Sequence, residues 1–198
     1  MILCLWNRSN KVTDSTLNTN LAGQPNNEIR MTRIGLLSDT HHFLDESIFL
    51  HFEQCDEIWH AGDFGSAILA ERLKAFKPFR GVYGNIDGPD IRSQFPETQR
   101  WICEGVRIMM THIGGYPPKY VPEIKKELMA DPPQLFICGH SHILRIMFDE
   151  QLQCLHMNPG AAGNQGWHQI RTIIRFVIDG ANMKDCEVIE LGKRSVKT

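Results

Sequence analysis

Five short groups of polar residues occur along the chain in an order that could build a metal site. Their side chains are carboxylates, an amide and imidazoles, which are the ligands that transition-metal ions take from proteins. Each group directly follows a short apolar run. A single group is weak evidence, because Gly-Asp and Gly-Asn are ordinary turn dipeptides, but the five together are specific. They are Asp39-Thr40-His41, Gly62-Asp63, Gly84-Asn85, His112 and Gly139-His140-Ser141-His142.

The chemistry of the set indicates which ions it suits. Two carboxylates, one amide oxygen and four imidazoles form a mixed nitrogen and oxygen set that favours Mn, Fe, Zn, Ni or Co. The set is too rich in nitrogen for a dedicated Mg or Ca site and lacks the thiolates of a structural zinc site. These ligands are too many for one ion and suit two ions that share a carboxylate. Because residues i and i+2 of an extended backbone point the same way, we expect Asp39 with His41, and His140 with His142, to present ligands together.

The apolar runs before these groups predict buried strands. The interval from each group to the next fits one strand plus one crossover, which indicates a largely parallel sheet flanked by helices. Ligands bind at the carboxyl edge of such a sheet. We therefore expect all five groups to converge along one edge. The predicted strands are residues 34–37, 57–60, 79–83, 106–111 and 134–138.

Helical spacing of apolar residues predicts helices over residues 45–55, 66–76 and 122–130. Ser66 can cap the second of these helices, and Pro122 suits the first turn of the third. After residue 142 the pattern changes to pairs of strand-like runs around turns. These runs predict antiparallel hairpins and a second sheet packed on the first. The hairpins are residues 143–148 with 152–157, and residues 172–178 with 186–191.

Length and composition indicate one globular domain with a substantial core. The 198 residues are 42% hydrophobic and 22% charged. The formal net charge of −2 argues against a broad interface with nucleic acid, because no basic surplus is available to displace counterions. Any recognition of phosphate must therefore be local.

Several features favour the cytoplasm. No apolar run approaches the ~20 residues that a membrane helix needs, and residues 1–6 lack the basic start of a secretory signal. The six cysteines include no Cys-x-x-Cys pair and lie within apolar runs, which is typical of buried free thiols in a reducing compartment.

The N-terminal segment differs from the rest of the chain. Residues 7–30 are rich in Asn, Ser and Thr and show no sustained period, so they offer little apolar surface to offset the entropy of ordering. We expect residues 1–30 to be a flexible polar extension that is dispensable. The working domain is then residues 31–198.

The other histidines and one loop give weaker signals. His42 fits a position beside the site and an exposed loop position equally well. We assign no role to His168. Packing roles are favoured for His51, His60 and His156. The loop over residues 158–163 could line the pocket through its backbone N–H groups, but a plain connection is favoured.

The motifs resemble those of the calcineurin-like metallophosphoesterases, and most closely those of the small YfcE-type phosphodiesterases. The resemblance runs from about Met31 to Gly192 and includes Asn158-Pro159-Gly160. It implies an α/β fold, a four-layer αββα sandwich with mixed sheets. It also implies two divalent metal ions, with Mn favoured and Fe, Ni, Zn or Co as alternatives. The implied ligands are Asp39, His41, Asp63 and His142 for the first ion, and Asp63, Asn85, His112 and His140 for the second.

The function implied by this resemblance is hydrolysis of phosphate esters. Two divalent ions against two carboxylates leave a charge of about +2, which a bridging hydroxide lowers to about +1. Such a site can generate a nucleophile near neutral pH and accept a phosphodiester anion. Asn85 is expected to help orient the phosphate. Asp87 is expected to orient a ligand or water, with a structural turn role as the alternative.

One position departs from the pattern of many family members. Their Gly-Asn is followed by a histidine that helps to protonate the leaving alkoxide, whereas this chain has Ile86 there; small members often lack the histidine too. Without that acid, esters with poor leaving groups should react slowly. We therefore predict stronger phosphodiesterase than phosphomonoesterase activity, best on aryl leaving groups. The expected partner is a small phosphodiester, with no large nucleic-acid interface and no membrane, and a homo-oligomer stays open.

Two other readings remain. A retromer subunit shares the architecture, lacks the same histidine and works mainly by docking partners, so a protein-binding scaffold with little catalysis is the main alternative. The complete ligand set favours the enzyme. A nuclease is disfavoured by the net charge, although short or nucleotide-like diesters stay open as substrates.

Overall fold

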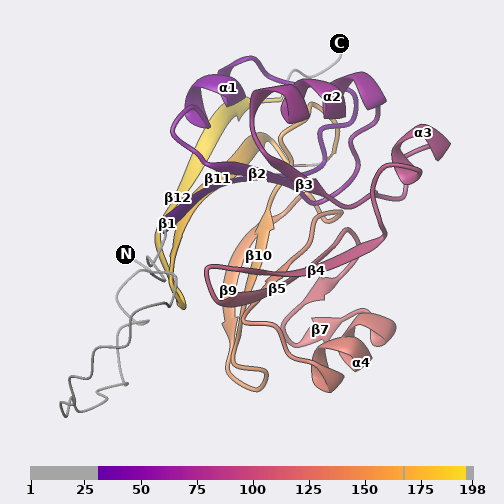
Figure 1. Cartoon of the computed structure of the whole chain (residues 1–198). Helices are drawn as coiled ribbons and strands as arrows, with labels where there is room; N and C mark the ends of the chain where they lie inside the picture. The colour runs from indigo at the N-terminus through magenta and orange to yellow at the C-terminus, as the bar shows by residue number, and fades with distance from the viewer. Residues whose placement is uncertain (1–30, 167, 195–198) are drawn as a thin grey trace, which may run out of the picture.

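Two five-stranded mixed sheets pack face to face in the computed structural model, which describes residues 31–166 and 168–194 (Figure 1). The first sheet has the strand order β12-β11-β1-β2-β3, and the second has the order β4-β5-β8-β10-β9. A two-stranded hairpin, β6 (Gly115–Tyr116) with β7 (Lys119–Tyr120), lies outside both sheets.

The first sheet combines a parallel half with an antiparallel half. Strands β1, β2 and β3 run parallel, and β11 pairs antiparallel with both β1 and β12. The β1 segment is apolar with buried side chains toward its end, as expected of a strand covered on both faces. The bounds are β1 Met31–Leu37, β2 Glu57–His60, β3 Phe79–Gly81, β11 Ile170–Asp179 and β12 Asn182–Lys193.

The second sheet is also mixed. Strands β5, β8 and β10 run parallel, while β4 and β9 form antiparallel hairpins with β5 and β10 at the two edges. Glu104 and Gly105 turn the first of these hairpins, both at positive φ, which matches the twist of the strands. The bounds are β4 Thr98–Cys103, β5 Val106–Thr111, β8 Leu135–Ile137, β9 Leu144–Asp149 and β10 Cys154–Pro159.

Helices form the two outer layers. Helices α1 (Ser47–His51) and α2 (Ala67–Phe76) cover the first sheet, and α4 (Pro122–Ala130) covers the second. The short α3 (Pro89–Arg92) follows β3. Ser66 caps α2 by accepting a hydrogen bond from the backbone N–H of Leu69.

The main core lies between the sheets. Alternate residues of β1 show why: Ile34 and Leu36 belong to the inter-sheet cluster, whereas Leu37 belongs to the cluster beneath α1 and α2, as the two-residue period of a strand requires. The two sheets also meet through Trp59 and Trp101, whose rings pack edge to face with centroids 4.9 Å apart. The first sheet, whose strands lead to site residues, is therefore packed on both faces.

The αββα architecture confirms the predicted fold class, and both predicted hairpins are antiparallel. One expectation was wrong: the five predicted strands do not share a sheet. Strands β5 and β8 belong to the second sheet, and the last hairpin, β11 with β12, joins the first. Local patterns show which segments are strands, but pairing between distant strands depends on tertiary packing. Strand β4, α3 and the β6–β7 hairpin were not predicted.

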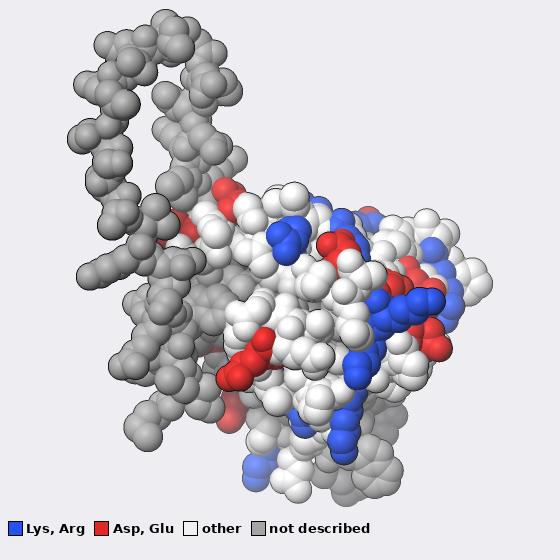
Figure 2. Space-filling model, turned by 90° about the horizontal axis from the view of Figure 1, so that it is seen from below, with Lys and Arg blue, Asp and Glu red and all other residues white. Residues whose placement is uncertain are grey.

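Other expectations concern the rest of the chain. Cys55, Cys103, Cys138 and Cys154 are buried free thiols, and Cys186 is half-buried. The polar extension over residues 1–30 lies outside the described residues. Among the helices described, none has the length and apolar character needed to cross a membrane. On the face in Figure 2, basic and acidic side chains lie near one another on a mostly uncharged surface.

Candidate metal centre

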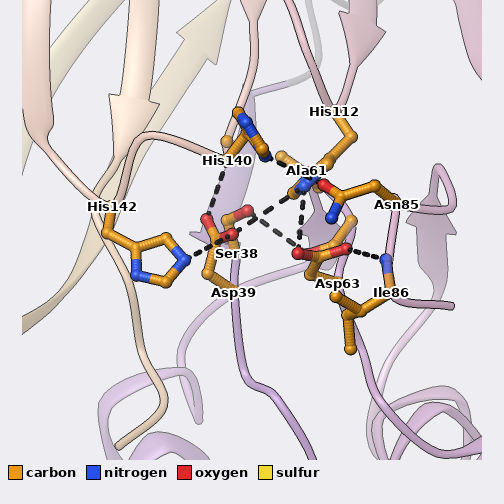
Figure 3. A network of polar contacts seen from close by, with 12 residues as sticks. Ser38, Asp39, Ala61, Asp63, Asn85, Ile86, His112, His140 and His142 are labelled. Carbon is orange, nitrogen blue, oxygen red and sulfur yellow. Dashed lines mark hydrogen bonds and ion pairs between the residues drawn. The ribbon is translucent and has the colours of Figure 1, made fainter. Parts of the chain in front are cut away.

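All seven predicted ligands meet where strands of the two sheets end. Figure 3 labels Asp39, Asp63, Asn85, His112, His140 and His142 among them. Three groups follow β1, β2 and β3 of the first sheet, and two follow β5 and β8 of the second. The site is therefore built between two sheet edges rather than along one. The carboxylates and imidazoles fall into two groups, and within each group the ligand atoms lie within 4.8 Å of one another. The groups are Asp39 with His41 and His142, and Asp63 with His112 and His140.

The first group joins the loops after β1 and β8. Nε2 of His142 lies 3.2 Å from Oδ1 of Asp39. The same nitrogen lies 3.1 Å from Nε2 of His41. Two imidazole nitrogens and a carboxylate oxygen therefore face a common point, which is the arrangement that a bound cation requires.

The second group joins the loops after β2, β3, β5 and β8. Nε2 of His112 lies 3.2 Å from Oδ2 of Asp63. Across the group, Nδ1 of His140 lies 2.9 Å from the amide oxygen of Asn85. Figure 3 shows Asn85 turned toward His140 and Asp63. Asn85 therefore adds an oxygen ligand to this group.

The two groups adjoin through their carboxylates. Oδ2 of Asp63 lies 3.7 Å from Nε2 of His41, a member of the other group. Oδ1 of Asp39 in turn lies 3.9 Å from Nε2 of His112. Because each carboxylate reaches a histidine of the other group, either could be shared by two cations.

The backbone at the ligands is not extended. Asp39, Asp63, His140 and His142 have φ values of 54°, 60°, 64° and 58°, and His41 has 46°. The strand-like alternation expected at Asp39 with His41 and at His140 with His142 was therefore wrong. Asp39 and His41 still meet in one group, whereas His140 and His142 belong to different groups. Left-handed backbone at non-glycine residues costs about 1–3 kcal/mol each and clusters at functional sites. The packing around these turns must hold them.

Backbone hydrogen bonds hold the turns together. The N–H of Asp39 donates to the carbonyl of Gly62, and the N–H of His140 donates to Oδ2 of Asp39 at 3.1 Å. Gly84 must be glycine, since a Cβ there would lie 1.9 Å from Oδ1 of Asp63. The loop over residues 158–163 contributes as well, because the N–H of Gly163 donates to the carbonyl of Asp39. This loop therefore supports the turn that carries Asp39.

Asp87 is buried beside the second group. Its Oδ2 accepts hydrogen bonds from the N–H groups of Asp63 at 3.0 Å and Gly84 at 2.8 Å. Its Oδ1 accepts one from the N–H of Gly65 at 2.9 Å. The carboxylate thus ties the loop after β3 to the loop after β2.

The electrostatics of the site favour positive charge. Burial lowers the pKa of His41 and of His140, so both imidazoles are neutral near pH 7 and can act as ligands. Burial also acts to lower the pKa of His112, but the carboxylates of Asp63 and Asp39 outweigh it and raise that pKa. The pKa of Asp63 is lowered, because His112 and the N–H of Ile86 outweigh the effect of burial. The buried carboxylates would therefore stabilise a cation bound among them.

Two atoms provide a test of whether metal ions fit. Oδ1 of Asp39 and Nε2 of His112 are buried and have no hydrogen-bond partner among the described residues. Buried polar atoms without partners are rare and costly. Both atoms point into the cluster of carboxylates and imidazoles, and a divalent cation would satisfy both. The residues present therefore fit such ions.

Two of the other histidines have packing contacts. His60 is buried, stacks on Phe64 with centroids 3.8 Å apart and contacts Thr40 Oγ1 at 3.0 Å. His156 is buried against the carbonyl of Gly115. These contacts agree with the packing roles expected for both. His51 is half-buried on α1, and His42 and His168 are exposed.

Two residues support the ligands through side-chain contacts that the sequence did not predict, although Asn158 lies in a loop that it singled out. The side-chain amide of Asn158 donates to the carbonyl of Gly139 at 2.7 Å and to Oγ of Ser141 at 3.2 Å, so it fixes the turn between His140 and His142. The guanidinium of Arg92 donates to the carbonyl of Asp87 at 2.7 Å. Only the fold reveals both contacts. Asn158 reaches a turn on another strand, and Arg92 reaches back from α3 to the loop after β3.

Comparison with known proteins indicates the same family as the sequence motifs. The sequence model of the calcineurin-like phosphoesterase superfamily domain matches residues 32–181. A probable metallophosphoesterase of Methanothermobacter thermautotrophicus is 30% identical over 169 residues, which cover 80% of this chain and 92% of that protein.

Solved structures share the fold. A structure described as a novel archaeal phosphodiesterase superposes with a TM-score of 0.64 at 20% identity, covering 80% of this chain and 99% of that one. Chaetomium thermophilum Vps29 also gives 0.64, at 13% identity with 82% and 99% coverage. The profile match, the related protein and the clustered ligands agree: this chain belongs to the calcineurin-like phosphoesterase superfamily.

Proposed function

We propose that this protein is a phosphodiesterase that depends on two divalent metal ions, with Mn favoured. The observation that carries the proposal is the pair of adjoining ligand groups, each with its own carboxylate and two imidazoles. Oδ1 of Asp39 and Nε2 of His112, which are buried without a hydrogen-bond partner among the described residues, also support it.

The proposed ligand sets follow from the contacts. Asp39, His41 and His142 would hold one ion. Asp63, His112, His140 and the amide oxygen of Asn85 would hold the other, and Asp63 would be shared because its Oδ2 also lies near His41. When bound, such ions would supply activation of water and neutralisation of phosphate charge.

The remaining residues would position these ligands. The carboxylate of Asp87 holds the backbone of Asp63, and the N–H of Ile86 donates to Oδ1 of Asp63 at 3.0 Å. Asn85 is exposed, so its side chain can contact a phosphate as well as an ion. A carboxylate fixed by backbone donors keeps its geometry when substrate binds.

The preference for diesters rests on Ile86. This residue follows Asn85 at the rim and is 42% exposed, and its apolar side chain cannot donate a proton to a leaving oxygen. Leaving groups that depart without protonation, such as aryl oxides, should therefore react best. We propose small aryl or nucleotide-like phosphodiesters as the substrate class.

The test uses the purified full chain. After chelation and reconstitution with Mn, Fe, Ni, Zn or Co, elemental analysis should give two ions per chain, and the best metal should support hydrolysis of bis(4-nitrophenyl) phosphate. The chelated protein and a variant carrying both D63A and H112A serve as controls. A chain that binds no metal at saturation, or a variant as active as the wild type, would contradict the proposal.

The same experiment tests the alternative function, a protein-binding scaffold, which the similarity to Vps29 structures leaves open. A scaffold has no need of two complete ligand groups. Stoichiometric metal without hydrolysis of any diester tested would favour the scaffold. We also propose that the protein is cytoplasmic and that residues 1–30 are dispensable. A homo-oligomer stays open.

A further inference from the structure

A hollow of about 200 Å³ opens beside His140, on the side of the second sheet. We call it the Arg145 hollow. Its walls come from the loop after β5, the β6–β7 hairpin and the start of β9. The residues used below are Ile113, Tyr116, Val121, His140, Ile143 and Arg145. Because His140 belongs to both the hollow and a ligand group, a substituent on a phosphate bound at the metal centre can extend into the hollow.

Arg145 is the charged group of this hollow. Its guanidinium carbon lies 3.7 Å from the centroid of the Tyr116 ring. Within residues 31–166 and 168–194, the guanidinium of Arg145 has no hydrogen bond or ion pair. A half-buried guanidinium stacked on an aromatic ring, with its donors unused, is ready to bind an electron-rich or anionic group.

The fold presets this arrangement. Arg145 lies on β9 opposite Asn158 of β10, and Asn158 also fixes the turn that carries His140 through its bond to Gly139. Tyr116 lies on β6, in a hairpin whose Gly115 carbonyl contacts buried His156 at 3.1 Å. The cation and the aromatic ring therefore come from separate elements, both tied to the buried core of the second sheet.

A second hollow beside the metal centre has the opposite character. It has a volume of about 450 Å³, includes Asn85 and His112, and shares Ile113 and Val121 with the Arg145 hollow. Three carboxylates line it, and its one arginine, Arg92, donates to backbone carbonyls. The carboxylates belong to Glu97, Glu123 and Glu127. Two hollows that each include a histidine of the same ligand group suit the two substituents of a phosphodiester.

Building on the proposed function, we infer that the Arg145 hollow receives one aromatic substituent of the substrate, with an anionic or hydrogen-bond-accepting edge facing Arg145. Its volume is below the roughly 300–1,000 Å³ of whole-ligand sites, so it takes a single ring system. Exposed Ile113 and Ile143 supply apolar contact. Arg145 pairs with the edge of the ring, as arginine does with nucleobases and carboxylates. Arg145 is thus a specificity-determining residue.

Calorimetric titration of the Mn-loaded full chain tests the inference with phosphonates, which resist hydrolysis. The probes are methylphosphonate, phenylphosphonate and 4-carboxyphenylphosphonate. We expect phenylphosphonate to bind about tenfold more tightly than methylphosphonate, and the carboxyl group to add about tenfold more. R145A should abolish the gain from the carboxyl group, and R145K should keep part of it. R107A, which removes an exposed arginine from the far end of β5, is the matched control and should keep both gains.

The outcomes separate this inference from the proposed function. The inference about the hollow is wrong if methylphosphonate binds but the three probes bind equally, or if R145A keeps both gains. Neither result contradicts the proposed metal centre. If none of the probes binds to protein that has been saturated with Mn, both the hollow and the proposed function are wrong.

Discussion

The carboxylate of Asp87 accepts a hydrogen bond from the backbone N–H of Asp63 at 3.0 Å. Asp63 has a φ of 60°, so its backbone needs support from outside its own turn. Asp87 provides it from the next loop along the sheet. This places Asp87 behind the candidate ligands, where it fixes their geometry without facing the metal site.

The first prediction concerns this support. D87N should lower the free energy of unfolding by about 2–3 kcal/mol, since a buried charged acceptor of three N–H groups is replaced by an amide that offers a single acceptor oxygen. It should also weaken Mn binding by roughly 10–100-fold. Urea denaturation and Mn titration measure the two effects. D90N, in the first turn of α3 and exposed, should change neither, and a D87N protein with wild-type metal affinity would contradict the positioning role.

Metal stoichiometry should distinguish the two ligand groups. H142A removes a member of the first group and H140A a member of the second, so each should retain about one ion per chain where the wild type holds two. D63A should weaken both, because its carboxylate lies near histidines of both groups. Elemental analysis after gel filtration gives the ratio, and an H140A protein that keeps two tightly bound ions would exclude the proposed assignment.

Replacing Ile86 should change the dependence on the leaving group. I86H places an imidazole beside Asn85 at the rim, where it can protonate a departing alkoxide. We expect hydrolysis of alkyl esters to rise by about tenfold or more, while aryl diesters change little. A series of esters that spans leaving-group pKa shows the change as a shallower slope of log kcat/KM.

The control for I86H is the same substitution at Ile68, an exposed position of α2, which adds an imidazole away from the centre. I68H should leave the slope as in the wild type. Equal slopes in all three proteins would show that position 86 does not govern protonation of the leaving group.

His60 should make stability depend on pH. Burial lowers its pKa to about 3, and its Nδ1 accepts from the N–H of Gly62, so the folded protein holds it neutral. The unfolded chain binds a proton near pH 6.5, so the stabilisation is complete above that value and is lost as pH falls toward 3. The loss should approach about 1.4 kcal/mol per pH unit.

Urea denaturation at pH 8 and pH 5 tests this prediction. H60Q should reduce the difference in unfolding free energy between the two pH values. F64L is the matched control, because it removes the ring stacked on His60 but leaves the titrating group, and it should cost a similar amount at both pH values. An H60Q protein with the full wild-type difference would assign the pH dependence to other groups.

Truncation tests the expected domain boundary. Strand β1 begins at Met31, which pairs with Asp179 of β11, so a chain that starts at Met31 retains every contact described above. We expect it to keep the melting temperature and the diesterase activity of the full chain. Loss of solubility or activity on removal of residues 1–30 would show that the N-terminal segment contributes to the folded domain.

Local sequence patterns determined most of the elements and the candidate ligands of this protein. The apolar runs, each followed by a group such as Asp39-Thr40-His41 or Gly139-His140-Ser141-His142, identified which segments are strands and which side chains lie at their ends. Those features depend on neighbours in sequence: burial of consecutive residues, the strand period and the turn preference of glycine.

Tertiary structure alone decided how those ends meet. Strands β5 and β8 pair in a second sheet, so the ligands converge from two edges rather than one. The hydrogen bond from the N–H of Asp63 to Asp87 and the stacking of Arg145 on Tyr116 join residues distant in the chain. So does the hydrogen bond from the N–H of His140 to Asp39, which links two left-handed turns. Such contacts depend on which surfaces pack together, and packing is a property of the whole folded chain rather than of any local segment.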